Sequence, residues 1–447
     1  MADFRGKNIT VVGLARSGVA AANLLNAAGA SVTANDNRAE SELKDALSRL
    51  SPGIKRVLGG HPDALFTKAD LIMISPGVPL SAPPLVKASE AGVKVIGELE
   101  LAYIVSGSPF IAITGANGKS TTTTLVGEIL KKAGMSALVG GNLGNALTEA
   151  PDELMGRDWI VAEVSSFQLE TTETFRPRVS AVLNITQDHM DRYSGMADYT
   201  RAKARVFMNQ GAGDTLLLNA DDPATYALRG EANCRVVYFS RKGAVEGMYV
   251  KDGWIMDGLS GEASRVMPVA DIKIKGAHNV ENALAAAAIS ILAGASRESV
   301  ADTLREFPGL EHRMEFVREL DGVAYYNDSK GTNVGAVEKS VEGFTTPVIL
   351  IAGGLDKHSD FSPLKPLMRE KVKRLILIGK AAVVMNEALG AETDTVMAAT
   401  LEEAVHSARD AAGPGDTVLL SPACASFDMF RDFEDRGRKF KELVNKL

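Results

Sequence analysis

Cysteine is scarce in this chain of 447 residues, which contains only Cys234 and Cys424. Two thiols cannot build the disulfide framework of a small secreted domain, and so few are typical of a reducing compartment. An excess of positive charge is also absent, because 49 Lys and Arg face 56 Asp and Glu and leave a net charge of −7. This balance argues against a broad nucleic-acid-binding face, but it allows a local basic pocket for a phosphorylated small molecule.

Long apolar runs are missing as well. The longest uncharged apolar segment, residues 282–295, is shorter than the roughly 18 residues of a membrane span. The apolar stretch near the N-terminus is too short for the core of a signal peptide. We therefore expect a soluble cytoplasmic protein with no nucleic-acid or membrane partner, and nothing in the sequence requires more than a monomer.

Short β-branched runs alternate with helical patterns along the chain, without an internal repeat or a low-complexity tract. Buried strands are predicted at 8–14, 31–36, 70–78, 110–114, 158–165, 178–186, 215–222, 323–329, 347–354, 374–380 and 416–422, and helices at 17–29, 121–134, 275–295 and 401–413. The alternation predicts an α/β fold of three consecutive domains, with a hinge in FPGLEHR (307–313). We place the domains at residues 1–97, 98–309 and 310–447.

The turn after the first predicted strand, VVGLARSGVA, is bounded by Gly13 and Gly18, but Ala15 replaces the middle glycine of a dinucleotide fingerprint. A turn of this kind before a helix points backbone N–H groups and the helix dipole at an anion. Asp36 ends the next strand, where an acidic residue can bind a ribose hydroxyl. The pattern predicts a Rossmann-like N-terminal domain, although a tight turn without a ligand fits the same residues.

The stretch ITGANGKSTTTT (113–124) lies between an apolar strand and a helical pattern. The common phosphate-loop pattern G-x-x-x-x-G-K-[ST] has a glycine where this chain has Ile113, so the loop is shorter than usual. Gly115 and Gly118 let the backbone approach phosphate oxygens. Lys119 can neutralise phosphate charge, and the Ser120 hydroxyl can bind Mg²⁺. We predict a central P-loop ATPase-type domain; the alternative is a Gly-rich turn with a surface lysine.

Polar residues follow other predicted strands. Glu163 ends the apolar run DWIVAE, where a carboxylate is costly unless it meets a cation, although it could also cap a helix. His189 in NITQDHMDRY could be a ligand, an acid–base group or a satisfied polar residue, and Lys203 alone is an ordinary helix lysine. YNDSKGTN (326–333) and SPACASFDMFRDFEDRG (421–437) place polar residues at strand ends of a second Rossmann-like domain at the C-terminus.

Taken together, these motifs resemble the Mur ligases, which build the peptide stem of bacterial peptidoglycan and are related to the folylpolyglutamate synthases. The resemblance runs nearly end to end, and its ordered motifs are ITGANGKSTTTT, AEVSSFQLE, NITQDHMDRY, HNVENALAA, HR at 312–313, NDSKGTN and SPACASFDMF. GLARSG, ISPGVP, HMDRY and SPACASFDMFRDFEDRG are similar to the branch of the family that adds D-glutamate. Arg16 stands where a threonine is frequent in that branch.

The resemblance implies an ATP-dependent ligase that adds D-glutamate to UDP-N-acetylmuramoyl-L-alanine through an acyl phosphate. It implies ATP contacts at Gly115, Asn117, Gly118, Lys119, Ser120, Thr121, Asn282, Arg313 and Asp328. Two Mg²⁺ sites are expected, with Ser120, Glu163, His189 and a carbamylated Lys203 as the metal-binding residues, and Lys119, His189 and Lys203 as the catalytic ones. The UDP-sugar would contact Asp36, Arg38, Ser75, Gly77, Asn142 and Gln168, and D-glutamate would contact Thr332, Lys357, Ser426 and Phe433.

Other classes of protein explain less of the sequence. A nicotinamide-dependent oxidoreductase would account for the N-terminal turn and leave TGANGKST without a role. A GTP-driven switch would need a guanine-binding N-K-x-D tetrad, which is not found in the expected place. A non-catalytic nucleotide-binding module would have no need of Glu163, His189 and Lys203 together. Within the ligases, the alternative is another Mur-type or folylpolyglutamate-type enzyme with a different amino-acid substrate.

Overall fold

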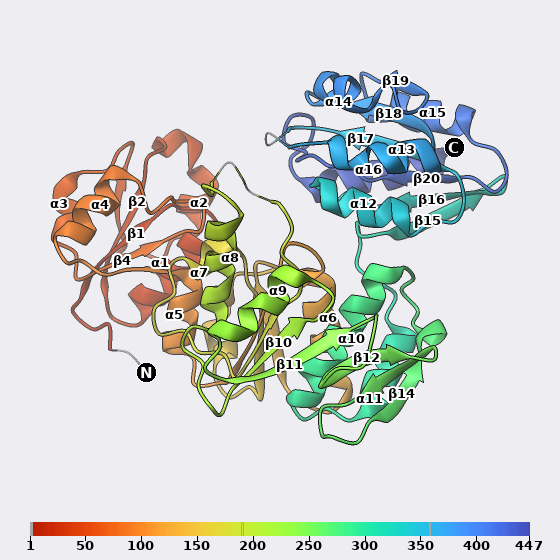
Figure 1. Ribbon diagram of the computed structural model, residues 1–447. Helices are drawn as coiled ribbons and strands as arrows, with labels where there is room; N and C mark the ends of the chain where they lie inside the picture. Colours follow the sequence, from red (N-terminus) through yellow and green to blue (C-terminus); the bar gives the residue numbers. More distant parts are fainter. Residues whose placement is uncertain (1–2, 189, 191, 357–358) are drawn as a thin grey trace.

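The computed structural model describes residues 3–188, 190, 192–356 and 359–447, and it contains three sheets that follow one another along the chain. Figure 1 shows them as three bodies, with the N-terminal sheet in red and orange, the central one in yellow and green and the C-terminal one in blue. Within the described ranges, no helix has both the length and the apolar composition needed to cross a bilayer.

The N-terminal sheet is parallel, with strand order β3-β2-β1-β4-β5. Its elements are β1 (Asn8–Val12), α1 (Arg16–Ala27), β2 (Ser31–Asp36), α2 (Lys44–Ser48), β3 (Lys55–Leu58), α3 (Asp63–Thr67), β4 (Leu71–Ile74), α4 (Pro83–Glu90), β5 (Val95–Gly97) and α5 (Glu98–Val105). The order reverses between β1 and β4, and open α/β sheets bind ligands at such a switch point. Ser75 and Gly13 meet there, because the Ser75 hydroxyl donates to the Gly13 carbonyl at 2.7 Å.

The central sheet has nine strands in the order β14-β13-β12-β11-β10-β9-β6-β8-β7. Its strands are β6 (Phe110–Thr114), β7 (Ala137–Gly141), β8 (Trp159–Glu163), β9 (Val179–Val182), β10 (Thr215–Asn219), β11 (Arg235–Ser240), β12 (Gly247–Lys251), β13 (Trp254–Asp257) and β14 (Ser264–Pro268). The helices are α6 (Lys119–Lys132), α7 (Ser166–Leu169), α8 (Met196–Ala204), α9 (Pro223–Ala227), α10 (Ala277–Leu292) and α11 (Arg297–Glu306). Strands β6 to β12 pair in parallel, and β12 to β14 form antiparallel hairpins.

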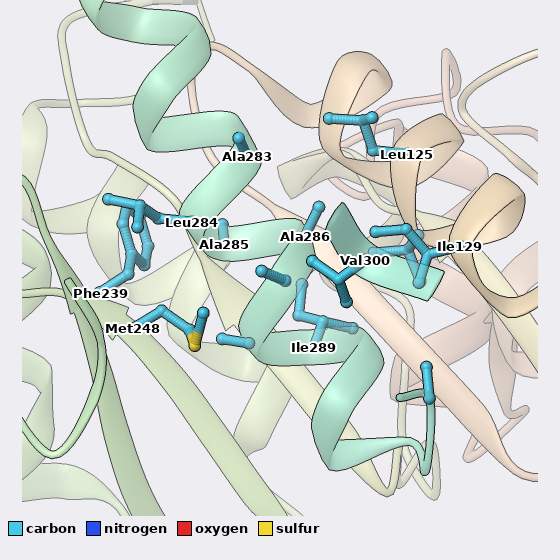
Figure 2. Packing of buried hydrophobic residues seen from close by; sticks show 14 of the residues in the cluster. Leu125, Ile129, Phe239, Met248, Ala283, Leu284, Ala285, Ala286, Ile289 and Val300 are labelled. Carbon is cyan, nitrogen blue, oxygen red and sulfur yellow. The ribbon is translucent and has the colours of Figure 1, made fainter. Parts of the chain in front are cut away.

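Helix α10 forms the centre of the largest apolar cluster, which Figure 2 shows from close by. Its body, ALAAAAISIL, is rich in alanine, so α6 and the sheet can pack close to its backbone. Ile289 of α10 is fully buried in the same cluster as Ile129 of α6 and Val300 of α11. This packing fixes α6, and with it the loop that precedes α6, against the sheet.

The C-terminal sheet has strand order β15-β16-β20-β17-β18-β19, and only the β15–β16 pair is antiparallel. Its elements are β15 (Glu315–Leu320), β16 (Val323–Asn327), α12 (Val334–Glu342), β17 (Val348–Gly353), α13 (Lys365–Lys371), β18 (Val372–Ile378), α14 (Ala382–Leu389), β19 (Thr395–Met397), α15 (Leu401–Ala411), β20 (Thr417–Leu420) and α16 (Phe433–Lys446). No helix or strand covers residues 307–314, the segment predicted as a hinge.

The predicted α/β architecture of three domains is confirmed, and the strands predicted at 31–36 and 110–114 match β2 and β6. Most of the other predicted strands extend beyond the observed ones into the turn that follows, and the strand predicted at 374–380 begins and ends two residues after β18. The sequence analysis missed the strands β3, β5, β7, β11 to β15 and β19, and several helices, among them α16. Helix α16 was hidden by its charged sequence, FEDRGRKFKELVNK, in which only Phe440 and Val444 are buried apolar side chains.

Replacing Ile289 by alanine should lower the free energy of unfolding of the central domain by about 2–5 kcal/mol, because it leaves a cavity in a closed cluster. Both tryptophans, Trp159 and Trp254, lie in the central sheet, so urea unfolding followed by their fluorescence reports on this domain. Ile291→Ala is the matched control, since Ile291 lies on the same helix and is only partly buried. Equal losses in both variants would contradict the packing described here.

Candidate active site

The loop between β6 and α6 has the geometry of a phosphate-binding turn. Gly118 adopts a φ of 82°, and a Cβ there would lie 2.3 Å from Oδ1 of Asn282. Gly115 has a φ of 152°, and its Cβ would lie 3.1 Å from the side chain of Leu183. Both glycines are therefore required by the backbone and by the close approach of neighbouring residues. The first residue of α6 is Lys119, so the N-terminus of a 14-residue helix faces the space in front of the loop.

Asn184, which follows β9, holds this loop from the neighbouring strand. Its carbonyl accepts from Ala116 N at 3.0 Å, and its Oδ1 accepts from Asn117 N at 2.8 Å. Its Nδ2 donates to the Asn117 carbonyl at 3.0 Å. The sequence analysis gave Asn184 no role, although it lies in the motif NITQDHMDRY directly after a predicted strand. Such an asparagine, next to a phosphate loop in the sheet, is the signal that would have found it.

Two lysines converge on one carbonyl of the loop. Lys119 Nζ donates to the Gly115 oxygen at 2.9 Å and to the Ala116 oxygen at 2.9 Å. Lys203 Nζ, from α8, donates to the same Gly115 oxygen at 2.9 Å and lies 4.4 Å from the centre of the Tyr199 ring. Burial lowers the pKa of Lys119, and burial together with the charge of Lys119 lowers the pKa of Lys203 well below its usual range.

Glu163 ends β8, the strand that pairs with β6 on the other side of the loop, so it faces Lys119. Its Oε1 accepts from Asn142 Nδ2 at 2.8 Å. Its Oε2 is buried without a hydrogen-bond partner among the described residues. Burial opposes ionisation, but the charges of Lys119 and Arg313 and the hydrogen bonds that the carboxylate accepts together keep the pKa of Glu163 below its usual range. A buried carboxylate oxygen with free lone pairs is a ligand for a cation.

These residues fit an Mg²⁺ ion that is bound together with the phosphates of a nucleotide. The described residues contain no group of three His, Cys, Asp or Glu side chains that could hold a metal ion by themselves. Mg²⁺ usually binds one or two protein oxygens and the phosphates of its nucleotide rather than a dedicated cage. The Glu163 carboxylate, and the Ser120 hydroxyl at the start of α6, supply such oxygens.

The C-terminal domain contributes cations and a buried acid to the same place. Arg313 Nη2 donates to Ser120 Oγ at 2.8 Å across the domain boundary. Asp328, which follows β16, accepts from the hydroxyls of Ser340 at 2.8 Å and Ser421 at 2.7 Å. Burial raises the pKa of Asp328 to about 6. Lys330, which was not predicted, lies 3.6 Å from the Phe433 ring centre, and burial lowers its pKa to about 8.

A cavity of about 230 Å³ lies between the central and C-terminal domains. It is lined by many of the predicted site residues: Asn117, Gly118, Lys119, Thr121, Asn142, Glu163, Asn282, Arg313, Asp328 and Thr332. Gly115 and Ser120 adjoin it through their hydrogen bonds to Lys119 and Arg313. It also contains residues that sequence reasoning missed, among them Asn184, His278, Lys330 and Asn333. His189 and Lys357 lie outside the described residues.

The residues predicted for the UDP-sugar, apart from Asn142, lie away from this cavity. Asp36 ends β2 and accepts from Leu14 N at 2.8 Å and from Arg38 Nη2 at 2.8 Å. Burial acts to raise the pKa of Asp36, but these hydrogen bonds and the charge of Arg38 outweigh it and lower the pKa to about 2. Ser75 lies at the switch point, and the Cα of Gly77 faces open space. Gln168 of α7 caps its own helix, since its Oε1 accepts from Ser165 N at 3.0 Å.

Arg16, the first residue of α1, joins the N-terminal domain to the central one. Its Nη1 donates to the Gly144 carbonyl at 3.0 Å, and its Nη2 donates to Glu149 Oε2 at 3.0 Å. It also donates to the Asn145 side chain. Residues 144–149 follow Asn142, so Arg16 ties the first helix of the N-terminal domain to the segment that supports Glu163.

Two further residues predicted for D-glutamate, Ser426 and Phe433, lie in the C-terminal domain. Ser426 is buried and follows the bridge between Leu355 and Ala425. Phe433 begins α16, and its carbonyl accepts from Ser329 Oγ at 2.8 Å. Arg436, one turn further along α16, donates to the Ser329 carbonyl at 2.8 Å and is fully buried. This packing fixes the start of α16 against the strand-end segment that carries Asp328 and Lys330.

The arrangement can bind a polyphosphate and bring a second anion to it. Lys119, Arg313 and Lys330 supply positive charge from two domains, and the N-terminus of α6 adds its dipole. A low-dielectric cavity strengthens these interactions. Glu163 and Ser120 supply oxygen ligands for a cation that accompanies the phosphates. Such a site suits phosphoryl transfer, in which catalysis depends on positioning and on charge rather than on a protein nucleophile.

Known proteins match this chain over its whole length. The Mur ligase MurD-like N-terminal domain matches residues 7–97, the Mur ligase middle domain 113–290, and the Mur ligase glutamate ligase domain 312–424. Relatives from Pelotomaculum thermopropionicum and Geotalea daltonii, both named UDP-N-acetylmuramoylalanine–D-glutamate ligase, are each 48% identical over 100% of this chain and 99% and 98% of theirs. The structure of a pseudomurein peptide ligase type C from Methanothermus fervidus has the same fold, with a TM-score of 0.63 and 21% identity over 99% of this chain and 100% of that one.

His278 gives the site a measurable dependence of stability on pH. Burial, reinforced by Lys339 and Arg313, lowers its pKa from 6.5 to about 4. Above pH 6.5 the imidazole is neutral in both states, whereas between pH 6.5 and 4 the unfolded chain takes up the proton first. Acidification to pH 5 should therefore cost about 1–2 kcal/mol of unfolding free energy through this residue. Tryptophan-monitored urea unfolding at pH 7 and 5 should show a smaller loss in His278→Gln; equal losses would contradict the shift.

Proposed function

The chain belongs to the Mur ligase family, and we infer that it is the ATP-dependent ligase that joins D-glutamate to UDP-N-acetylmuramoyl-L-alanine in the synthesis of peptidoglycan precursors. Two relatives that match it end to end at 48% identity carry that activity in their names. The observation that carries the chemistry is the short phosphate loop: the charge of the buried Glu163 acts on its Lys119, and its Ser120 accepts a hydrogen bond from Arg313 of the next domain. We propose that the UDP-sugar, ATP and D-glutamate are bound by residues from all three domains.

The reaction needs ATP because a carboxylate resists attack by an amine, since oxide is too poor a leaving group. Transfer of the γ-phosphoryl group of ATP to the carboxylate of the L-alanyl residue gives an acyl phosphate and ADP. The amine of D-glutamate then attacks the acyl carbon, phosphate leaves, and the amine loses its proton as the amide forms. Both partners of the first step are anions, so their approach requires cations between them.

The protein's own residues supply much of that charge. Lys119 and the first turn of α6 are placed to bind the β- and γ-phosphates, and Arg313 reaches the same region from the C-terminal domain. Asn282, which lies against Gly118, would contact the adenine, and Asp328 the nucleotide from the other side of the cavity. Mg²⁺ held by Ser120 and Glu163 would neutralise phosphate charge and orient the γ-phosphoryl group.

We propose a second metal site in which Lys203 is carbamylated and His189 lies nearby. An ammonium beside Mg²⁺ would repel it, whereas a carbamate offers anionic oxygens. The environment supports the modification: burial and Lys119 lower the pKa of Lys203, which favours the neutral amine. That amine can form a bond to the carbon of CO₂ with release of a proton. The carbamate would also remove the repulsion between the two lysines on the Gly115 carbonyl.

The two remaining substrates have separate supports. We propose that the UDP-sugar contacts Asp36, Arg38, Ser75, Gly77, Asn142 and Gln168, which lie on the N-terminal domain and on the adjoining edge of the central domain. For D-glutamate we propose Thr332, Lys357, Ser426 and Phe433, because a lysine and hydroxyls suit an amino acid with two carboxylates. We also propose domain limits at 97/98 and 309/310, a monomer, and a cytoplasmic location; the presence of only two cysteines in the sequence is in keeping with the last.

Phosphate release from ATP and Mg²⁺ with UDP-N-acetylmuramoyl-L-alanine should occur with D-glutamate and stay at background with L-glutamate, L-alanine or diaminopimelate. The measurement separates this ligase from sister enzymes that share the mechanism. Release with another amino acid would reassign the substrate.

Lys119→Ala should reduce phosphate release by at least about a hundredfold at an unchanged unfolding midpoint, because it removes the principal cation of the phosphate loop. Near-normal turnover in Lys119→Ala would refute the assignment of the phosphate loop.

Lys203→Ala should lose nearly all activity, because the variant cannot form the carbamate. Short carboxylic acids such as formate or acetate should restore part of it, since they can place an oxygen ligand in the space that the side chain leaves. Lys203→Arg, which keeps the positive charge, should not be restored. Phosphate release with and without added carboxylate checks this expectation, and equal inactivity of Lys203→Ala under both conditions would argue against the carbamate.

A further inference from the structure

Arg192 connects the N-terminal and central domains at the loop proposed to contact the UDP-sugar. Its Nη1 donates to the Pro76 carbonyl at 3.3 Å, and Pro76 lies between Ser75 and Gly77. Its Nη2 donates to Glu170 Oε2, beyond the end of α7, at 2.7 Å. The guanidinium carbon lies 4.2 Å from the centre of the Phe167 ring. One side chain of the central domain therefore binds the 75–77 loop of the N-terminal domain.

This arrangement needs an arginine. A planar guanidinium can stack on an aromatic ring while it donates in two directions, whereas a lysine ammonium is a single point charge on a flexible stem. The Arg192 and Glu170 side chains are 21% and 18% exposed, so their ion pair is largely shielded from water. Pairs of this kind are geometrically better defined than surface ion pairs, which contribute little.

The contacts continue from Arg192 to the phosphate loop. Glu170 Oε1 accepts from the Tyr193 hydroxyl at 2.5 Å, and the Tyr193 ring stacks on Phe167 with centres 6.0 Å apart. Tyr193 in turn packs on Tyr199 at 5.2 Å, and Tyr199 lies 4.4 Å from Lys203 Nζ. Lys203 donates to the Gly115 carbonyl. A continuous set of packed side chains thus joins the Ser75–Gly77 loop to the site of phosphoryl transfer.

We propose that Arg192 is a positioning residue for the UDP-sugar substrate, because it fixes the 75–77 loop on the central domain. The loop would then hold the nucleotide end of the substrate at a distance from the phosphate loop that lets the acyl end reach the γ-phosphate. The proposal rests on the function given above. Arg192 acts through Pro76 and Glu170. Arg192 contacts the 75–77 loop directly, whereas it reaches the phosphate loop through a series of intervening side chains, so the effect should fall mainly on the UDP-sugar.

Steady-state kinetics of Arg192→Gln test this selectivity. The KM for UDP-N-acetylmuramoyl-L-alanine should rise about tenfold or more, since two hydrogen bonds from a charged group are lost. The KM values for ATP and D-glutamate, and kcat at saturation, should change less than about threefold. Arg192→Lys should fall between this variant and the wild type, because it keeps the charge next to Glu170 but cannot make all three contacts. Arg201→Gln is the matched control, since Arg201 is exposed and, among the described residues, forms its ion pair with Asp198 of the same helix.

Glu170→Gln provides a second test that does not depend on the stability of the first variant. It keeps the side-chain volume and removes the charge that orients Arg192, so it should raise the same KM, and the double variant should be no worse than Arg192→Gln alone. An unchanged UDP-sugar KM in both single variants would overturn the proposal. So would an equal rise in the KM for ATP, because that would show a general structural role. Wild-type enzyme without phosphate release would instead refute the proposed function.

Discussion

The carbonyl oxygen of Gly115 is the point on which the rest of the site depends, because Lys119 and Lys203 both donate to it at 2.9 Å. Burial disfavours the charged form of both ammonium groups and lowers both pKa values, and the charge of Lys119 lowers the pKa of Lys203 further. The charges of Glu163 and Asp188 act in the opposite direction. A loop prepared in this way gains stability when negative charge arrives, whether from the phosphates of ATP or from modification of Lys203.

The loop can hold these lysines only because its backbone is fixed from three sides. Gly118 packs so closely against Asn282 of α10 that no side chain fits there. Asn184 binds both ends of the Ala116–Asn117 turn from the neighbouring strand. The buried face of α10 anchors α6 to the sheet (Figure 2). The resulting surface is rigid on the central domain, and the C-terminal domain adds Arg313, Asp328 and Lys330 to it.

The fold was largely predictable because strands buried on both faces leave a local signature. The run FIAIT was predicted as a strand and is β6, and the limits of β2 were also predicted. Strands β12 to β14 were not, since they form a hairpin extension whose exposed residues break the apolar run. Helix α6 begins at Lys119, two residues before its predicted start, because these polar residues belong to the helix N-terminus that the loop presents.

The sequence by itself determined the chemistry of the phosphate loop, because Gly115, Gly118, Lys119 and Ser120 lie within a single turn and their spacing fixes their geometry. It also placed Glu163 and Asp36 at strand ends, where neighbouring parallel strands bring side chains to one edge. Only the tertiary structure decided that Glu163 faces Lys119, that Arg313 reaches Ser120 from another domain, and that Arg192 supports Pro76. These contacts join residues that are far apart in the chain, and the burial that shifts their pKa values exists only once the domains have packed.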